Sequence, residues 1–287
     1  MIYHDLILDG ANPGANIGAA FTADQNETQL VPKGDYLDHF SMSIQGSVST
    51  AAVTLESALG LVSQFTFKVG QETRIQLSAS DLVALMAMFY KELPTAWENT
   101  DATGKTYVLG IKIPVQETID NAQKYAYSIT HAAVTNFAST TLSLDAVYMN
   151  KPSGRNPIIA VPSPYTTAGA TGSTNPSIQV PPLGNILGIL LYQTTVPTDA
   201  GITYDVQRVQ MVLSGKLGSV MHAGNASNLF GASGYVNLNP FGEVLNNYQL
   251  FDFRDDPLDA KANNVQFNLD IETASEATRI IPIIEKV

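Results

Sequence analysis

The hydrophobic pattern of the first half of the chain predicts β-strands separated by short turns. Phe40, Met42 and Ile44 alternate with polar residues, and residues 65–69 repeat the same two-residue period before Gly70. This alternation places every second side chain on one face, as in a half-buried strand. Further strands of this kind are expected at 74–77, 107–115, 125–132 and 141–149.

One segment of this half changes period and predicts a helix. Residues 80–90 are apolar with a helical rather than an alternating pattern. Ser80 is predicted as the N-cap, Asp81 favours the positive start of the helix, and Pro94 stops it.

The second half repeats the strand pattern. Strands are expected at 158–161, 186–191, 206–213, 248–253, 264–271 and 279–285. A short helical turn is predicted around 224–230, with Asn225 or Ser227 as its cap. Pro282 restricts the last strand to a sheet edge or a bulge, because proline has no N–H to donate.

The two halves can be laid over one another. Residues 65–90 and 209–230 each comprise a strand, a glycine turn and a helix-capable stretch, and the strand at 141–145 matches the one at 266–270. The same element order twice indicates two copies of one fold. The alternative is a chance match between two β-rich halves.

The positions of glycine- and proline-rich stretches divide the chain into four predicted segments. Residues 1–35 form an N-terminal arm with one short strand near residues 6–8. It is either a frayed terminus or a clamp on a neighbouring subunit. Residues 36–161 form the first β-rich domain, 162–184 a linker rich in Pro, Gly and Thr, and 185–287 the second β-rich domain.

Composition narrows the function classes. The 287 residues suffice for two domains. Charged residues make up 14%, against roughly 25% in an average soluble domain. With 15 basic and 26 acidic residues the formal charge is −11, which disfavours direct contact with nucleic acid. Cysteine is absent, which excludes disulfides and thiolate metal sites. No apolar run predicts a transmembrane helix, and no signal peptide is expected at the start.

The residues that could carry catalysis do not gather into a motif. The segment 102–106 ends like a phosphate-binding loop but lacks the first glycine, so a hairpin turn is expected there. Two carboxylate pairs could serve a glycosidase or simply face solvent. They are Glu117 with Asp120, and Asp270 with Glu272. The four histidines stand singly, without metal-ligand spacing: His4, His39, His131 and His222. We expect no catalytic residues, and not an enzyme.

Two further groups allow a binding role. Asp255, Asp256 and Asp259 are weak candidates for a structural Ca²⁺ site, since oxygen-rich loops bind this ion. The alternative is a solvated loop in which Arg254 is paired locally. No other cofactor is expected. Trp97, with Phe89 and Tyr90, forms either a carbohydrate platform or a loop anchor.

Four segments together resemble a known protein family. They are the two strand–glycine–helix segments, 65–90 and 209–230, and the closing strands, 141–149 and 264–286. The chain resembles the double jelly-roll major capsid proteins of tailless icosahedral viruses of bacteria or archaea. The resemblance is one of architecture and length over residues 36–287. It implies an all-β fold of two tandem eight-stranded jelly-roll β-sandwiches, with short helices in the inter-strand loops.

The resemblance also implies a function. Such a chain forms a homotrimer, a pseudo-hexagonal capsomer that tiles an icosahedral shell, and so resides in the virion capsid. Its partners are its own copies, neighbouring capsomers, and minor capsid, vertex or membrane proteins. The alternatives are a two-domain β-sandwich binding module for host attachment or carbohydrate, and a secreted hydrolase. A trimer without a small ligand favours the coat protein, and a glycan that protects Trp97 favours the binding module.

Overall fold

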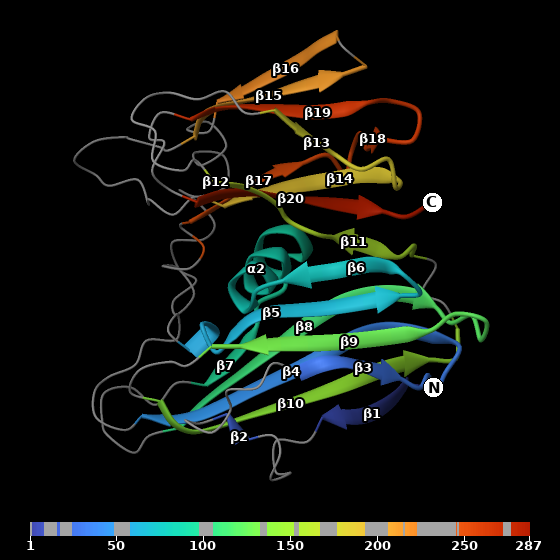
Figure 1. Cartoon of the computed structure of the whole chain (residues 1–287), viewed down its shortest axis with the longest axis vertical. Coiled ribbons are helices and arrows are strands. Elements are labelled where there is room, and N and C mark those ends of the chain that lie inside the picture. The colour runs from blue at the N-terminus through green and yellow to red at the C-terminus, as the bar shows by residue number, and fades with distance from the viewer. Residues whose placement is uncertain are drawn as a thin grey trace. The chain divides into compact units, whose positions relative to one another are not determined.

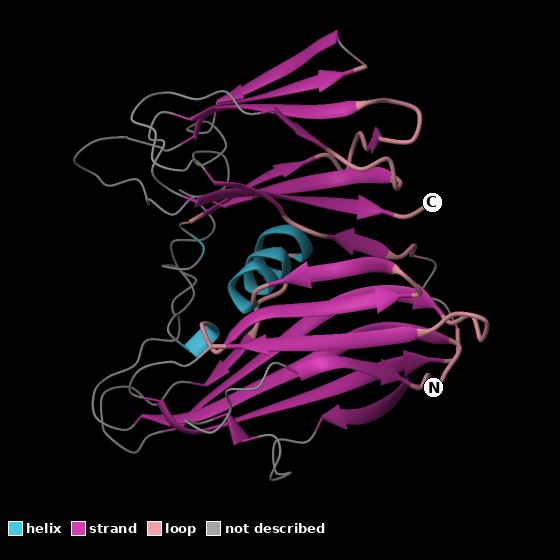
Figure 2. Ribbon diagram, viewed as in Figure 1, coloured by secondary structure: helices cyan, strands magenta, loops and turns pink. Residues whose placement is uncertain are grey.

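A computed structural model describes most of the chain, and Figures 1 and 2 show it as ribbons. The described residues are 2–8, 16–17, 25–48, 58–97, 106–132, 137–151, 155–166, 177–192, 206–214, 216–222, 245, 247–271 and 277–287. The chain divides into two compact units, Met1–Ile158 and Ile159–Val287.

The first unit contains two antiparallel sheets. One sheet has the order β1-β10-β4-β8-β7, and β2 also pairs with β10. The bounds of these strands are β1 Ile2–Leu8, β2 Asn16–Ile17, β4 Tyr36–Val48, β7 Thr95–Trp97, β8 Thr106–Thr118 and β10 Phe137–Met149.

The other sheet of this unit has the order β6-β5-β9-β3. Its strands are β3 Gln25–Leu30, β5 Val62–Val69, β6 Glu72–Leu77 and β9 Tyr125–His131. After β4 the chain enters this sheet as β5 and β6, returns as β7 and β8, crosses again as β9, and ends in the first sheet as β10 (Figure 1). Such repeated crossing between two antiparallel sheets is the jelly-roll arrangement.

Aromatic side chains join the two sheets of the first unit. Phe40 of β4 contacts Phe65 and Phe67 of β5 edge-to-face, with ring centroids 5.5 and 5.2 Å apart. Met42 and Ile44, which alternate with Phe40, are also buried. The two-residue period therefore selects the core face as predicted, and edge-to-face pairs add about 0.5–1.5 kcal/mol beyond burial.

The predicted helix is present, but its cap differs. Helix α2 spans Ala79–Ala84, and its N-cap is Ser78 rather than Ser80. Ser78 has an extended backbone (φ −73°, ψ 166°), and it shares a capping box with Asp81 at the third helical position. Ser80 lies inside the first turn, so its side chain cannot receive the N–H groups that a cap satisfies. The helix continues as the π-helix η1, Leu85–Tyr90, and ends at Lys91 in the left-handed region (φ 59°).

The second unit also has two groups of strands. Strand β14 lies between β17 and β20, with β18 paired to β14 and β12 to β20, and the other sheet has the order β13-β19-β15-β16. The bounds are β12 Ser163–Thr166, β13 Ser177–Gln179, β14 Asn185–Tyr192, β15 Val206–Leu213, β16 Lys216–His222, β17 Tyr248–Asp252, β18 Leu258–Asp259, β19 Val265–Ile271 and β20 Ala277–Glu285. The short strand β11, Ile158–Ala160, falls where the chain passes from one unit to the other.

A separate hydrophobic core fills the second unit. Phe267 and Leu269 of β19 pack in one buried cluster with Ile189 and Leu191 of β14 and Ile280 of β20. This cluster contains residues from both groups of strands, so the second unit is a sandwich in its own right.

The structure adds strands to the two segments predicted as arm and linker. Strand β1 pairs with β10 over Ile2–Leu8, longer than the strand expected near residues 6–8, and β3 pairs with β9. Within 162–184, β12 pairs with β20 and β13 with β19. The domain boundaries expected from the sequence remain a prediction.

Pro282 lies beside a register irregularity, the second of the two positions expected for it, and not at a sheet edge. Strand β20 pairs with β14 on one side and β12 on the other. Pro282 faces Ile189, and the register of β14 shifts between Ile186 and Gly188, directly beside it. The irregularity accommodates the missing N–H within an interior strand. The helical turn predicted at 224–230 lies outside the described residues.

Candidate functional site

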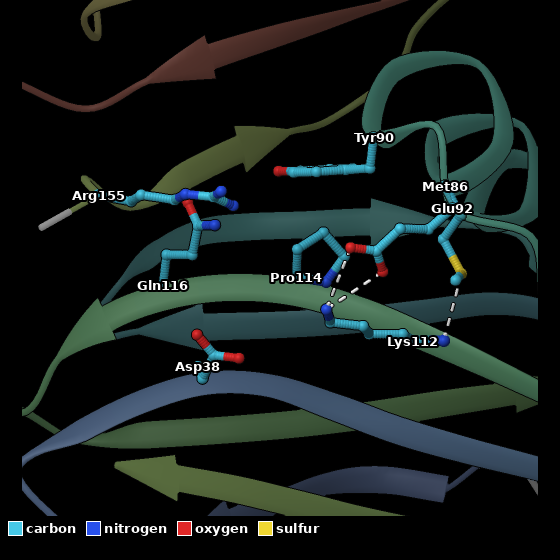
Figure 3. A pocket seen from close by; sticks show the side chains of 8 residues that line it. All are labelled: Asp38, Met86, Tyr90, Glu92, Lys112, Pro114, Gln116 and Arg155. Atoms are coloured by element: carbon cyan, nitrogen blue, oxygen red, sulfur yellow. Dashed lines mark hydrogen bonds and ion pairs between the residues drawn. The ribbon is translucent and has the colours of Figure 1, made fainter. Parts of the chain in front are cut away.

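The first unit contains a polar pocket of about 330 Å³, which we call the Tyr90 pocket (Figure 3). Its lining comes from η1 and the chain that follows it, from β8, from the start of β4, and from the segment after β10. The lining residues are Asp38, Met86, Tyr90, Glu92, Lys112, Pro114, Gln116 and Arg155.

The π-helix sets one wall of the pocket. Met86 and Tyr90 lie four residues apart on η1, and both line the pocket. The backbone N–H of Lys112 donates to Met86 Sδ over 3.2 Å, which fixes the helix against β8. Lys91 then turns the chain through a left-handed conformation, and Glu92 meets Lys112 Nζ at 3.1 Å. π-Helical turns of this kind recur at functional sites.

A β-bulge sets the opposite wall. The pairing of β4 with β8 shifts between Leu37 and His39, so that Val115 and Gln116 of β8 oppose Asp38 alone. Gln116 is buried and has φ +58°, a conformation that residues other than glycine seldom adopt. Bulges re-aim side chains and are frequent beside binding sites.

Asp38 is an acid of the pocket whose pKa is shifted by its neighbours. His39 Nδ1 donates to Asp38 Oδ2 over 2.7 Å. This hydrogen bond is the main cause that lowers the pKa of Asp38 below its ordinary value. Burial acts in the opposite direction, and the positive charges of Lys112 and Arg155 add to the lowering. Asp38 therefore presents an ionised carboxylate at neutral pH.

Arg155 supplies the pocket's uncommitted cation. Its side chain reaches the pocket from the segment after β10, and the residue is exposed. Within the described part of the chain, no hydrogen bond or ion pair involves Arg155. A guanidinium in this position is free to donate hydrogen bonds to a ligand.

The lining of the Tyr90 pocket offers hydrogen-bonding groups rather than a nucleophile. Its lining includes no Ser, Thr or Cys that could act as a nucleophile. Among the described residues, no group of three or more metal-ligating side chains gathers anywhere. What the pocket offers is fixed donors and acceptors around an aromatic ring.

A second charged cluster lies inside the first sandwich. Arg74 of β6 is buried and contacts Glu72 Oε1 at 2.7 Å and Glu117 Oε2 of β8 at 3.2 Å. The ion pair with Glu117 joins the two sheets. Asp120, the other carboxylate of the predicted pair, is exposed and accepts the N–H of Ala122. The two carboxylates therefore have different partners.

Two of the candidate calcium residues, Asp255 and Asp256, lie in a loop of the second unit, and Asp259 ends the short strand β18. Asp255 and Asp256 are exposed, and Asp259 Oδ1 accepts the N–H groups of Lys261 and Ala262. Arg254 pairs locally with Asp252, in line with the solvated-loop alternative. Structural calcium at these positions remains a prediction, which a chelator-dependent melting temperature would support.

The other sequence candidates do not converge. His4 is exposed on β1, and His131 is half-buried at the end of β9. Phe89 and Tyr90 contact each other edge-to-face at 5.1 Å. Several candidates fall outside the described residues or have undescribed side chains, and these are Trp97, 101–105, His222, Asp270 and Glu272. Sequence reasoning missed the Tyr90 pocket, because its residues are scattered from 38 to 155 without a common motif.

No described helix is long and apolar enough to cross a membrane. No protein-family model matches the chain. No curated protein matches its sequence significantly either. Sequence similarity therefore does not assign the chain to a family.

Solved structures do match. The major capsid protein of Sulfolobus Turreted Icosahedral Virus superposes with a TM-score of 0.70 at 11% identity, over 99% of this chain and 97% of that one. The PBCV-1 virus capsid model gives 0.60 at 10% identity, over 99% and 93%. The major capsid protein of bacteriophage PM2 gives 0.56 at 11% identity, over 100% and 98%. The chain thus has the double jelly-roll fold of these capsid proteins.

Proposed function

We propose that this chain is the major capsid protein of a tailless icosahedral virus, and that it assembles as trimers that tile the shell of the virion. The observation that supports this most strongly is the extent of the structural match. It covers 99% of this chain and 97% of the Sulfolobus Turreted Icosahedral Virus protein.

The chemistry of the surface supports the same role. Charged residues amount to 14% of the sequence, so few charged side chains have to leave water where identical neighbours pack together. Among the described strands, β1 ends its sheet, and its residues Ile2 and Leu6 are exposed. An exposed sheet edge offers unpaired backbone groups with which another chain can pair, and this pairing covers the edge. A closed trimer provides such a cover.

The coat role is structural, so we propose no catalytic activity for the chain. Its partners would be its own copies and neighbouring capsomers, with minor capsid, vertex or membrane proteins at special positions. The structural matches favour this role over a two-domain binding module. The net charge of −11 argues against direct contact with the genome.

Solution mass tests the proposal. Light scattering behind a sizing column should give a species near three times the chain mass of 30.7 kDa. This species should persist on dilution, and electron micrographs should then show hexagonal blocks. A monomer at high concentration, without such blocks, would count decisively against the coat role.

A further inference from the structure

We propose that the Tyr90 pocket binds a neutral polyhydroxylated ring, that is, one sugar unit of a glycan. This site goes beyond the coat role and does not depend on it. It makes the chain a coat subunit that carries a glycan site, rather than a dedicated binding module. Its evidence is the balance of charge, the hydrogen-bonding groups and the aromatic wall of one cavity.

The charges around the pocket cancel. Asp38 and Glu92 are acids, and Lys112 and Arg155 are bases, whereas the whole chain carries −11. Glu92 already neutralises Lys112. A ligand with a net charge of either sign would be attracted by one pair of side chains and repelled by the other. A neutral ligand avoids this conflict.

The hydrogen-bonding groups suit neighbouring hydroxyls. A hydroxyl both donates and accepts, so adjacent hydroxyls can bridge an acceptor and a donor. Asp38 accepts from His39 through Oδ2, and Oδ1 has no partner among the described residues. Arg155 can donate, and the Gln116 carboxamide can do both. Hydrogen bonds to charged groups such as these are the stronger ones.

The shape of the pocket suits a ring. Figure 3 shows the Tyr90 ring edge-on above Pro114, so one aromatic face is turned into the pocket. The C–H face of a sugar packs on such a surface, which combines apolar contact with a polar rim. A volume of about 330 Å³ lies at the lower end of ligand sites, roughly 300–1,000 Å³, and leaves room for one small ring system.

The pocket walls are held before a ligand arrives. Gln116 is buried and fixed by the bulge, and Tyr90 is held by η1 and by its contact with Phe89. Side chains that are already ordered lose little entropy on binding. The strained backbone at Gln116 is maintained next to the cavity rather than elsewhere on β8, as expected where a conformation serves a site.

Saturation-transfer NMR on the whole chain tests the proposal. The probes are glucose, galactose, mannose, N-acetylglucosamine, fucose and xylose. At least one should receive saturation from the protein. Arg155→Ala should weaken its binding about tenfold, because a charge-assisted hydrogen bond is lost. Lys151→Ala removes the same charge from an exposed residue outside the pocket, and it should bind as the unaltered chain does.

Three results would overturn the proposal. They are saturation of none of the six sugars, equal binding by the Arg155→Ala and Lys151→Ala variants, and displacement of the sugar by sodium succinate, which would indicate an anion site. Because Arg155 is exposed, its replacement leaves folding intact. The trimer is measured separately by its mass, so failure of the sugar site and failure of the coat role are distinguishable.

Discussion

Arg74 shows how one buried charge can tie two sheets together. Its guanidinium lies between Glu72 on its own strand and Glu117 on the facing sheet, and the residue is 4% exposed. Removing ions from water is costly, and the pair compensates only while both partners are present. The cluster therefore constrains how β6 and β8 align more than it raises net stability.

Replacing Arg74 should be one of the most damaging single changes in the first unit. Arg74→Met keeps the stem but leaves Glu117 buried without its cationic partner, so we expect a loss of about 3–5 kcal/mol. Urea unfolding measures it. Lys68→Met is the control, because its pair with Glu27 is exposed and worth under about 1 kcal/mol. Adding Glu117→Gln to Arg74→Met should restore part of the loss. A loss no larger than that of Lys68→Met would refute the role assigned to Arg74.

The contribution of Asp38 to the free energy of unfolding should depend on pH in the acid range. The folded-state pKa of this carboxyl is lowered, chiefly by the hydrogen bond from His39. Its stabilising contribution is therefore complete above the unfolded pKa of about 3.9, and it is lost as pH falls through the lower folded value. The gap in unfolding free energy between the unaltered chain and Asp38→Asn should be constant above about pH 5 and shrink below about pH 4. A gap that is flat from neutral pH into this acid range would contradict the assignment.

The local sequence predicts those features, such as turns, that depend on residues adjacent in the chain. The turn at Gly70 was expected from the end of the alternating run, and Gly70 has φ +61° between β5 and β6. The ion pair of Arg74 with Glu117 was not foreseen, because it joins residues 43 positions apart across two sheets. The Tyr90 pocket escaped prediction for the same reason: tertiary folding, and not spacing, brings Asp38 and Arg155 together.

At the level of single elements, α2 shows the limit of a pattern. The apolar run predicts the helix and its position, but it does not identify the N-cap. Ser78 precedes the periodic stretch and Ser80 begins it, so either serine could be the cap. Ser78 is the cap because its extended backbone lets Oγ receive the N–H of Asp81, while the Asp81 carboxylate accepts from the Ser78 N–H. Two serines two residues apart are not distinguished by residue type alone.

The same pair of serines provides a matched test. Ser78→Ala removes the capping box and should cost about 1 kcal/mol of stability. Ser80→Ala makes the same chemical change inside the first turn, where alanine is a good helix former, and should cost close to nothing. Thermal and urea unfolding of both variants would measure this difference. Equal losses, or a larger loss from Ser80→Ala, would place the cap at Ser80 after all.

At the scale of the whole molecule, the order of elements was more predictable than their pairing. Strand–turn–helix–strand order is visible along the chain, and it suggested two sandwiches. The pairing of β1 with β10 and of β3 with β9 was not visible, since 1–35 has the glycine and proline content of an arm. Those strands are stabilised by partners more than 90 residues away, and no local signal reports such partners.

The edge strand β1 carries the last prediction, which rests on the proposed coat role. Among the described strands β1 ends its sheet, and Ile2 and Leu6 expose 61% and 53% of their surface. Lysine on an edge strand discourages pairing with another chain. Leu6→Lys should therefore shift the trimer toward monomer in light scattering. Val287→Lys, a change at a similarly exposed residue of the second unit, should leave the mass unchanged. If both variants remain trimers at all concentrations, β1 lies outside the subunit interface and its apolar face requires another cover.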